Sequence, residues 1–241
     1  MIVAAHDEAA RIGATLAALE RAFPGARLWV ADDGSRDGTA AIARAAGALV
    51  VGSGRVVGKG GAMTAAARAA LERSRAERRP EVARAPTVAD QRAAAPGAIY
   101  VLCDGDLADS AGELAPLADA VRGGEADVAV AVFARRVGGG IGLALAFARW
   151  AIRSGCGVQT RAPISGQRAL AEHALEHVLP FAHGYGMELG MTIDAVRAGD
   201  RLIEIELDLA HRASGRSLAG FAHRARQLID FARAYARRRA R

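Results

Sequence analysis

Short apolar runs alternate along the chain with stretches in which apolar residues recur every three or four positions. Such runs are typical of buried strands, and the recurring spacing is typical of one helix face. The predicted strands are Ile2–Ala5, Leu28–Ala31, Ala48–Val51, Ala98–Cys103, Asp127–Phe133 and Leu202–Leu209. The predicted helices are Glu8–Ala22, Thr39–Ala46, Met63–Arg75, Ser110–Arg122, Leu143–Ser154, Glu188–Ala198 and 218–238. This alternation predicts βαβ units, a parallel sheet and the α/β class.

Three segments have patterns of their own. Residues 76–96 contain three prolines, many charges and little apolar periodicity, which is typical of a disordered surface insertion without catalytic residues. Leu143–Ser154 is apolar nearly all round, so we expect it to be buried or to lie against a lipid surface or a partner. Leu202–Leu209 alternates apolar and acidic residues, which indicates a half-exposed edge strand.

The composition is that of a globular protein with an alanine-rich core. The 241 residues suit a single domain over 1–241, because strands and helices alternate throughout. The chain contains no apolar run of about twenty residues and no signal-peptide pattern at Met1, so we expect a cytoplasmic protein. In that compartment Cys103 and Cys156 are most simply reduced core residues. The net charge of +6 suits phosphorylated substrates, anionic membranes and nucleic acid equally well.

Acidic turns follow two of the predicted strands. Asp104 and Asp106 end the run Ile99–Asp106, and the turn Asp32–Thr39 follows the second strand. Ligands of parallel α/β sheets bind at the carboxyl ends of the strands. Two carboxylates one residue apart repel each other, and a divalent cation bound to phosphate oxygens would remove that repulsion. The tripeptide therefore indicates a metal–diphosphate site, and the alternative is a polar turn after a buried strand.

Candidate chemistry also lies in several loops. Gly58–Gly61 places Lys59 at the start of a helix, a combination that suits a phosphate group, although the spacing is not that of a Walker A motif. Glu188 lies at the start of another helix, where it could act as a general base, bind a sugar or only stabilise the helix end. Pro163–Arg168 is predicted to be a polar turn before a helix. His211 could bind a metal or a phosphate, or be a surface residue.

Seven short motifs follow one another along most of the chain outside residues 76–96. In order they are A-A-H-D-E, D-D-G-S-R-D-G-T, G-K-G-G-A, D-G-D-L, S-G-Q-R-A, G-Y-G-M-E-L-G and H-R-A-S-G-R-S-L. Together they resemble glycosyltransferase family 2. The resemblance implies the GT-A fold, a Rossmann-like, mixed and mainly parallel sheet flanked by helices. It also implies hexosyl transfer from a nucleotide-diphosphate sugar, with Mg²⁺ or Mn²⁺ as cofactor.

The resemblance implies a role for each candidate residue. Ala5 and Glu8 would border the nucleotide pocket, and Asp33 would meet the base. Lys59 would lie beside the nucleotide. The implied metal ligands are Asp104, Asp106 and His211. The implied catalytic residues are Asp106 and Glu188, the latter near the sugar or the acceptor hydroxyl.

The acceptor is implied to be phosphorylated, because the motifs resemble two branches of the family. One branch uses small acceptors of the 3-phosphoglycerate kind, and the other uses polyprenyl phosphates. Guanidinium groups bind phosphate in a fork. The candidate phosphate ligands are Arg135, Arg136, Arg168 and Arg212.

The remaining expectations concern partners. We expect a UDP- or GDP-sugar donor and no nucleic acid. The basic helix 218–238 could lie on the inner face of a membrane, although a solvated basic face is favoured, and a homodimer is compatible with the resemblance. The alternative is a catalytically inactive regulatory protein of the same fold that binds nucleotide sugars. The presence of Asp33, Asp104, Asp106 and Glu188 argues against it.

Overall fold

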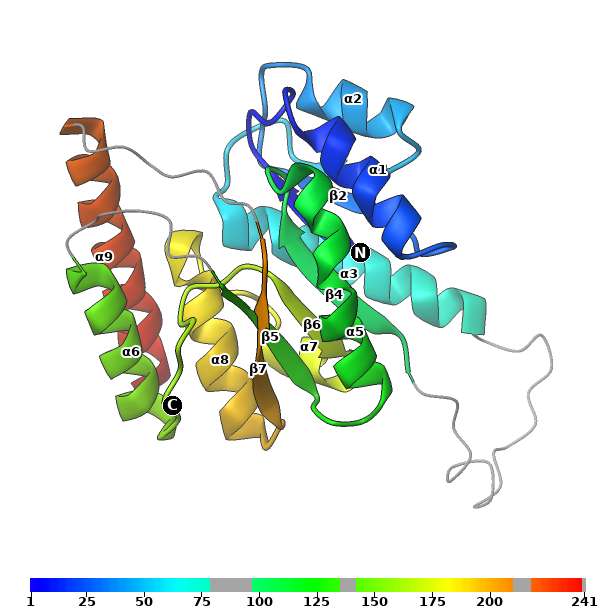
Figure 1. Cartoon of the computed structure of the whole chain (residues 1–241). Coiled ribbons are helices and arrows are strands. Elements are labelled where there is room, and N and C mark those ends of the chain that lie inside the picture. Colours follow the sequence, from blue (N-terminus) through cyan, green and yellow to red (C-terminus); the bar gives the residue numbers. More distant parts are fainter. Residues whose placement is uncertain (79–96, 135–141, 210–217, 240–241) are drawn as a thin grey trace, which may run out of the picture.

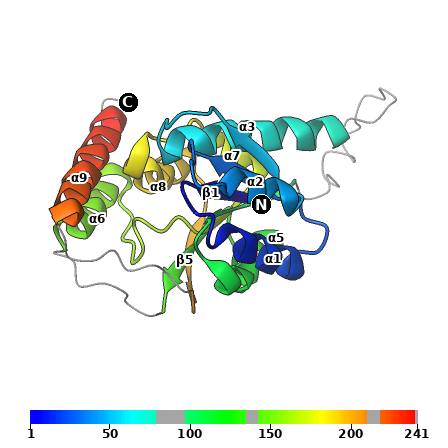
Figure 2. The same ribbon diagram turned by 90° about the horizontal axis from the view of Figure 1, so that it is seen from above.

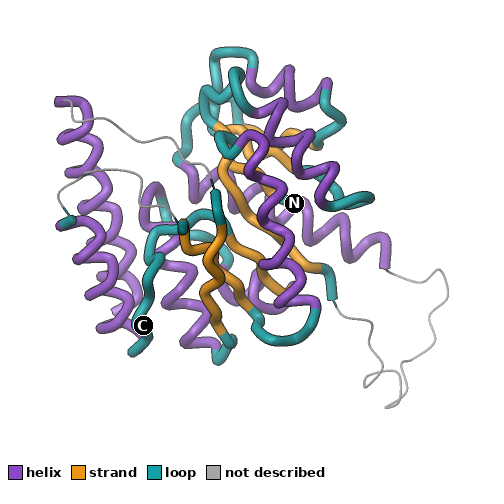
Figure 3. Tube along the Cα trace, in the orientation of Figure 1, coloured by secondary structure: helices purple, strands orange, loops and turns teal. Residues whose placement is uncertain are grey.

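The computed structural model describes residues 1–78, 97–134, 142–209 and 218–239. These residues form one seven-stranded sheet flanked by helices (Figures 1 and 3). The strands are β1 (Ile2–Ala5), β2 (Trp29–Asp32), β3 (Leu49–Gly52), β4 (Ile99–Asp104), β5 (Val128–Phe133), β6 (Arg168–Ala171) and β7 (Leu202–Leu207). The helices are α1 (Ile12–Ala22), α2 (Thr39–Ala45), α3 (Lys59–Arg78), α5 (Ala115–Arg122), α6 (Leu143–Cys156), α7 (Glu172–Val178), α8 (Met187–Ala198) and α9 (Leu218–Arg239), with short 3₁₀ turns η1 (Ala108–Leu114) and η2 (Gly184–Gly186).

The strand order is β3-β2-β1-β4-β6-β5-β7. β6 pairs antiparallel with both β4 and β5, and the other pairings are parallel. The α/β class and the mixed, mainly parallel sheet are therefore confirmed. Because β6 alone is reversed among the described strands, the carboxyl ends of β1, β2, β4, β5 and β7 lie along one edge. β7 is an edge strand, as its alternating pattern predicted.

Helices cover both faces of the sheet. One apolar cluster packs α1, η1 and α5 on one face, and a second packs α3, α7 and α8 on the other (Figure 2). A third cluster joins α6 and α9 to α8 at the end of the molecule away from α1 and α2 (Figures 1 and 2). The side chains of Ala148, Ala151 and Ile152 are buried there, whereas Leu143 and Trp150 on α6 are exposed. Thus one face of α6 is buried and another is exposed, so the burial that its apolar pattern predicted holds for one face only. Among the described helices, none combines the length and the apolar character needed to cross a membrane.

β6 is the main element that the sequence did not predict. Its four residues, Arg-Ala-Leu-Ala, form a buried strand between β4 and β5, where we predicted a turn leading directly into a helix. A strand this short shows no measurable periodicity, and alanine, leucine and arginine favour helices as much as strands. The predicted helix does follow, as α7, but only after the strand ends.

Several helix boundaries differ from prediction, and the contacts around two of them give the reason. α1 begins at Ile12 rather than Glu8, because residues 8 and 9 donate backbone hydrogen bonds to the α2 loop: Glu8 N–H to Thr39 Oγ1 at 2.8 Å and Ala9 N–H to an Asp37 oxygen at 2.9 Å. α3 continues to Arg78, because residues of its last turns form ion pairs with neighbouring elements, including Arg78 with Glu172. Residues 76–78 are therefore helical, and the rest of the predicted insertion lies outside the described residues.

Candidate active site

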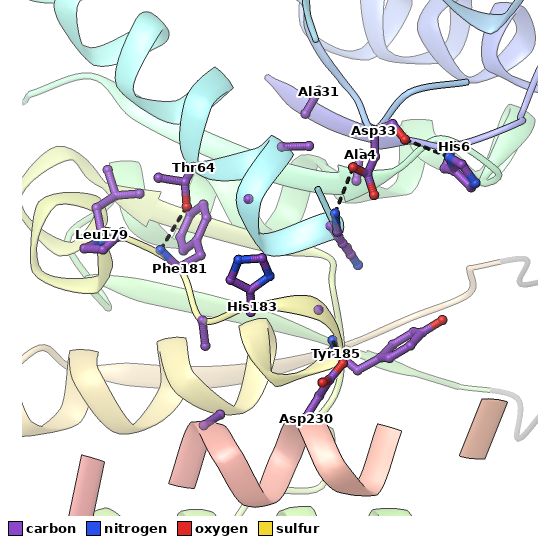
Figure 4. Close-up of a pocket in the computed structure, with 18 of the residues that line it drawn as sticks. Ala4, His6, Ala31, Asp33, Thr64, Leu179, Phe181, His183, Tyr185 and Asp230 are labelled. Atoms are coloured by element: carbon purple, nitrogen blue, oxygen red, sulfur yellow. Dashed lines mark hydrogen bonds between the residues drawn. The ribbon is translucent and has the colours of Figure 1, made fainter. Parts of the chain in front are cut away.

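A cavity of about 1390 Å³ opens at the carboxyl ends of β1, β2 and β4. On one side it is bounded by the loops that follow these strands and by the start of α3 (Figure 4). On the other side lie the segment Leu179–Tyr185 and one face of α9. The peptide N–H of Phe181 donates to Thr64 Oγ1 on α3 at 3.0 Å, so α3 holds this segment in place. The edge of the sheet at which we predicted the site thus holds a cavity.

Asp104, Gly105 and Asp106 all line this cavity. Asp104 ends β4, and its Oδ2 accepts a hydrogen bond from Gln167 Nε2 at 2.7 Å. Gly105 donates its N–H to the carbonyl of Ala4 at 2.8 Å, and a Cβ at this position would lie only 3.0 Å from the same oxygen. The glycine therefore lets the turn lie close against β1. Asp106 has a buried Oδ1 with no hydrogen-bond partner among the described residues.

Lys59 is the only lysine in the sequence. Its ammonium Nζ lies 2.7 Å from Asp104 Oδ1 and 2.7 Å from Glu188 Oε1. Burial lowers the pKa of Lys59, but the two carboxylates raise it more, so the pKa lies above its ordinary value. The ammonium therefore stays charged at physiological pH, and it joins β4 to α8 at the cavity wall.

Glu188 lies in the first turn of α8, where its side chain is 7% exposed. It is not among the residues that line the cavity, whereas Lys59 is. The carboxylate thus lies behind the ammonium, and the positive end of the α8 dipole also favours its charge. Sequence reasoning named both residues but did not pair them.

Asp33 organises the loop that enters α3. Its Oδ1 accepts hydrogen bonds from the peptide N–H groups of Val57 at 2.6 Å and Gly58 at 2.9 Å. The carbonyl of Asp33 lies 2.9 Å from His6 Nδ1 (Figure 4). Asp33, Ala5 and Glu8 all line the cavity, and the N–H of Asp33 donates to the carbonyl of Ala5 at 2.9 Å. The residues predicted for the nucleotide side are therefore together.

Comparison with known proteins agrees with this geometry. A profile for glycosyl transferase family 2 matches residues 1–73. Three solved structures of glucosyl-3-phosphoglycerate synthase from Mycobacterium tuberculosis are similar over nearly the whole chain. The structure without a named ligand has a TM-score of 0.64 and 28% sequence identity, and the match covers 95% of this chain and 76% of that one. The complex with Mn²⁺, UDP and phosphoglyceric acid has a TM-score of 0.68 and 28% identity, and the complex with Mn²⁺ and UDP-glucose has a TM-score of 0.66 and 27% identity; both matches cover 97% of this chain and 77% of the other. The profile match and the shared fold support a glycosyltransferase that is similar to family 2. Comparison with curated proteins gives no significant match.

In this glycosyltransferase Arg168 lies beneath the site rather than in it. The side chain is fully buried and does not line the cavity. Its Nε donates to the carbonyl of Ser165 at 2.9 Å and one terminal nitrogen donates to Thr192 Oγ1 at 2.9 Å, while burial lowers its pKa to about 10. Arg168 thus supports the turn that carries Gln167, and its placement gives no support to the predicted contact with an acceptor phosphate.

Sequence reasoning missed two features of the glycosyltransferase site. Gln167, which orients Asp104, lies in the quoted S-G-Q-R-A motif but was given no role. α9 lines the far end of the cavity with Arg233 and Arg237, which are exposed, as predicted for its basic face, but were not predicted to border the site. The other predicted residues, Arg135, Arg136, His211 and Arg212, lie outside the described residues.

Gly60 makes a testable contact beside Lys59. A Cβ at this position would lie 1.9 Å from the carbonyl oxygen of Ala182, a backbone atom that cannot move independently. We expect Gly60→Ala to lower the free energy of unfolding by about 3 kcal/mol, measured by urea denaturation. Gly13→Ala is the matched control, because its Cβ would meet Ile42 at an ordinary 3.5 Å. Equal midpoints for the Gly60→Ala and Gly13→Ala variants would contradict the prediction.

Proposed function

We propose that this protein transfers a hexosyl group from a UDP-sugar to a small phosphorylated acceptor of the phosphoglycerate kind, with Mn²⁺ or Mg²⁺ as cofactor. One observation carries the proposal: the buried Oδ1 of Asp106, which has no hydrogen-bond partner in the described part of the chain, lies at the cavity that the Lys59–Asp104 ion pair also lines. Similar synthase structures add support, because they are complexes with Mn²⁺ and UDP-glucose, and with Mn²⁺, UDP and phosphoglyceric acid.

The site's donor atoms suit the proposed cation. Carboxylate oxygens are the ligands that Mg²⁺ and Mn²⁺ prefer, and such ions often use only one or two carboxylates together with substrate phosphates. Asp106 offers an oxygen that no other group in the described ranges contacts through a hydrogen bond, and Asp104 offers a second carboxylate that Gln167 holds in place. When bound, the cation would neutralise negative charge on the departing diphosphate. His211 stays the predicted third ligand.

The chain's own residues would bind the donor and favour departure of the diphosphate. Lys59 supplies a fixed positive charge where negative charge develops, and the cost of orienting it is met during folding. Asp33 fixes the preceding loop and thereby the start of α3. Glu188 holds Lys59 from behind. The Glu188 carboxylate is buried, is held 2.7 Å from the Lys59 ammonium and does not line the cavity, so we assign Glu188 a positioning role rather than that of the general base.

The proposed acceptor is small and anionic. Arg233 and Arg237 give the far end of the cavity guanidinium groups, which suit phosphate and carboxylate. The alternative acceptor is a polyprenyl phosphate, which would present the same phosphate chemistry on a lipid.

The decisive experiment is a donor and acceptor screen on the full chain. UDP-glucose and GDP-glucose are each offered with 3-phosphoglycerate or a short polyprenyl phosphate, in Mn²⁺ or in EDTA. We expect transfer from UDP-glucose to 3-phosphoglycerate, its loss in EDTA and its return when Mn²⁺ is added in excess.

The other outcomes are distinct. Transfer to the polyprenyl phosphate alone would reject the small acceptor, and undiminished activity in EDTA would reject the cation. Binding of UDP-glucose without any turnover would favour the inactive regulatory protein. Binding of neither nucleotide sugar would reject the whole proposal.

A further inference from the structure

Two histidines and two aspartates meet near the amino ends of β5 and β7, and one of them, His177, also lines the cavity. Asp127 immediately precedes β5 and Asp200 lies two residues before β7, so both are at the amino ends of parallel strands. His173 and His177 are four residues apart on α7, and therefore share one side of that helix. The catalytic carboxylates lie at the carboxyl end of β4, so the length of a six-residue strand, roughly 20 Å, separates the two groups.

The ligand atoms of Asp127, His173 and Asp200 lie within 4.8 Å of one another, and His177 contacts Asp200. His173 Nε2 lies 3.6 Å from Asp127 Oδ1 and 3.7 Å from Asp200 Oδ1, and His177 Nδ1 lies 3.0 Å from the same Asp200 oxygen. The two imidazole rings are 5.8 Å apart between centroids. Ligand atoms bound at about 2.0–2.2 Å to a tetrahedral ion are separated by roughly 3.3–3.6 Å. The observed separations bracket this range, so small side-chain rotations would accommodate an ion.

The charges of the cluster also suit a divalent cation. The Asp200 side chain is only 3% exposed, yet its carboxylate faces two imidazoles. Asp127 is bound by the guanidinium of Arg201 through two nitrogens at 3.1 Å, and this contact lowers the pKa of Asp127. Arg201 offsets one negative charge, which leaves the cluster a net charge of about −1 with neutral imidazoles. Two nitrogen donors favour Zn²⁺ and similar ions over Mg²⁺ or Mn²⁺.

We propose that His173, His177 and Asp200, with Asp127 as a further oxygen donor, form a second metal site for a divalent ion of the zinc class. The ion would replace the hydrogen bond between His177 and Asp200 and would join α7 to the starts of β5 and β7. Because this edge is remote from the D-G-D turn, the site is structural. Its ligands do not include Asp104, Asp106 or Lys59, although His177 borders the same cavity.

Zinc titration of the full chain tests the proposal. After removal of metals, Zn²⁺ alone is titrated by calorimetry into the wild type, a His173→Gln/His177→Gln variant and an Asp106→Asn variant. We expect one tight site in the wild type and in Asp106→Asn, and at least a tenfold loss of affinity in the histidine variant. Zn²⁺ should also raise the melting temperature of the wild type but not of the histidine variant. Glutamine is chosen because its amide N–H can still donate a hydrogen bond to the buried Asp200 carboxylate after the imidazole is removed.

Two results would overturn the site. One is zinc affinity in the histidine variant equal to that of the wild type, and the other is loss of the tight site in Asp106→Asn. A second measurement does not depend on any variant: anomalous diffraction at the zinc edge from wild-type crystals grown with Zn²⁺. A peak between His173 and Asp200 is expected, and the absence of a peak there would reject the proposal. Neither measurement requires sugar transfer, so failure here is distinguishable from failure of the proposed function.

Discussion

Asp106→Asn is expected to lower the turnover of sugar transfer by about a thousandfold while leaving the fold intact. The substitution keeps the size of the side chain but removes the charge from the one cavity carboxylate that has a buried oxygen without a partner among the described residues. An amide oxygen is a poorer ligand for a hard cation than a carboxylate oxygen. The measurement is kcat with saturating UDP-glucose, 3-phosphoglycerate and Mn²⁺.

The same turn provides a matched control. Asp109 lies three residues further on, its side chain is 88% exposed, and Asp109→Asn makes the same change of charge. We expect the control to keep wild-type turnover, and both variants to keep the wild-type circular dichroism spectrum. If both variants lost activity equally, the effect would come from net charge near the cavity. If Asp106→Asn kept full turnover, the proposed cation site would be wrong.

The parts of the fold that depend on local patterns could be predicted from the sequence. Strands such as Asp127–Phe133 are runs of apolar residues, and the observed β5 differs from this prediction by one residue at its start. β6 could not be predicted in this way, because its strand character depends on insertion between β4 and β5 rather than on its own four residues. Tertiary context overrode local propensity there.

The site was predictable as a set of residues but not as a set of contacts. Sheet topology alone brings Asp33 and Asp104 to one edge, since both follow parallel strands. The contact between Lys59 and Glu188 joins residues 129 positions apart, and no local pattern contains it. The proposed second metal site was equally unpredictable from local patterns, because its histidines and aspartates come from separate segments that meet only after the sheet has formed.

Loss of the charge of Lys59 should have the second large effect. Lys59→Met leaves Asp104 and Glu188 near each other without the ammonium that separates them, and it removes the positive charge proposed to face the diphosphate. We expect turnover to fall by about a hundredfold and the affinity for UDP to fall as well. Lys59→Arg, which keeps the charge but not the geometry, should be impaired less. Steady-state kinetics and UDP calorimetry measure the two effects.

Because Lys59 is the only lysine, chemistry at high pH, where part of its ammonium is deprotonated, can separate charge from shape, provided that peptide mapping distinguishes Lys59 from the Met1 α-amine. Acetylation removes the charge of the ε-amine, whereas reductive methylation keeps it. Acetylation at Lys59, located by peptide mass spectrometry, should abolish transfer and should be slowed by UDP; methylation should be tolerated better. The Lys59→Arg variant is the control, because its remaining activity should resist the same reagent. Equal inactivation of the wild type and Lys59→Arg would show that the sensitive amine is not Lys59. If methylation lowered transfer as much as acetylation, the space around Nζ, rather than its charge, would limit the reaction.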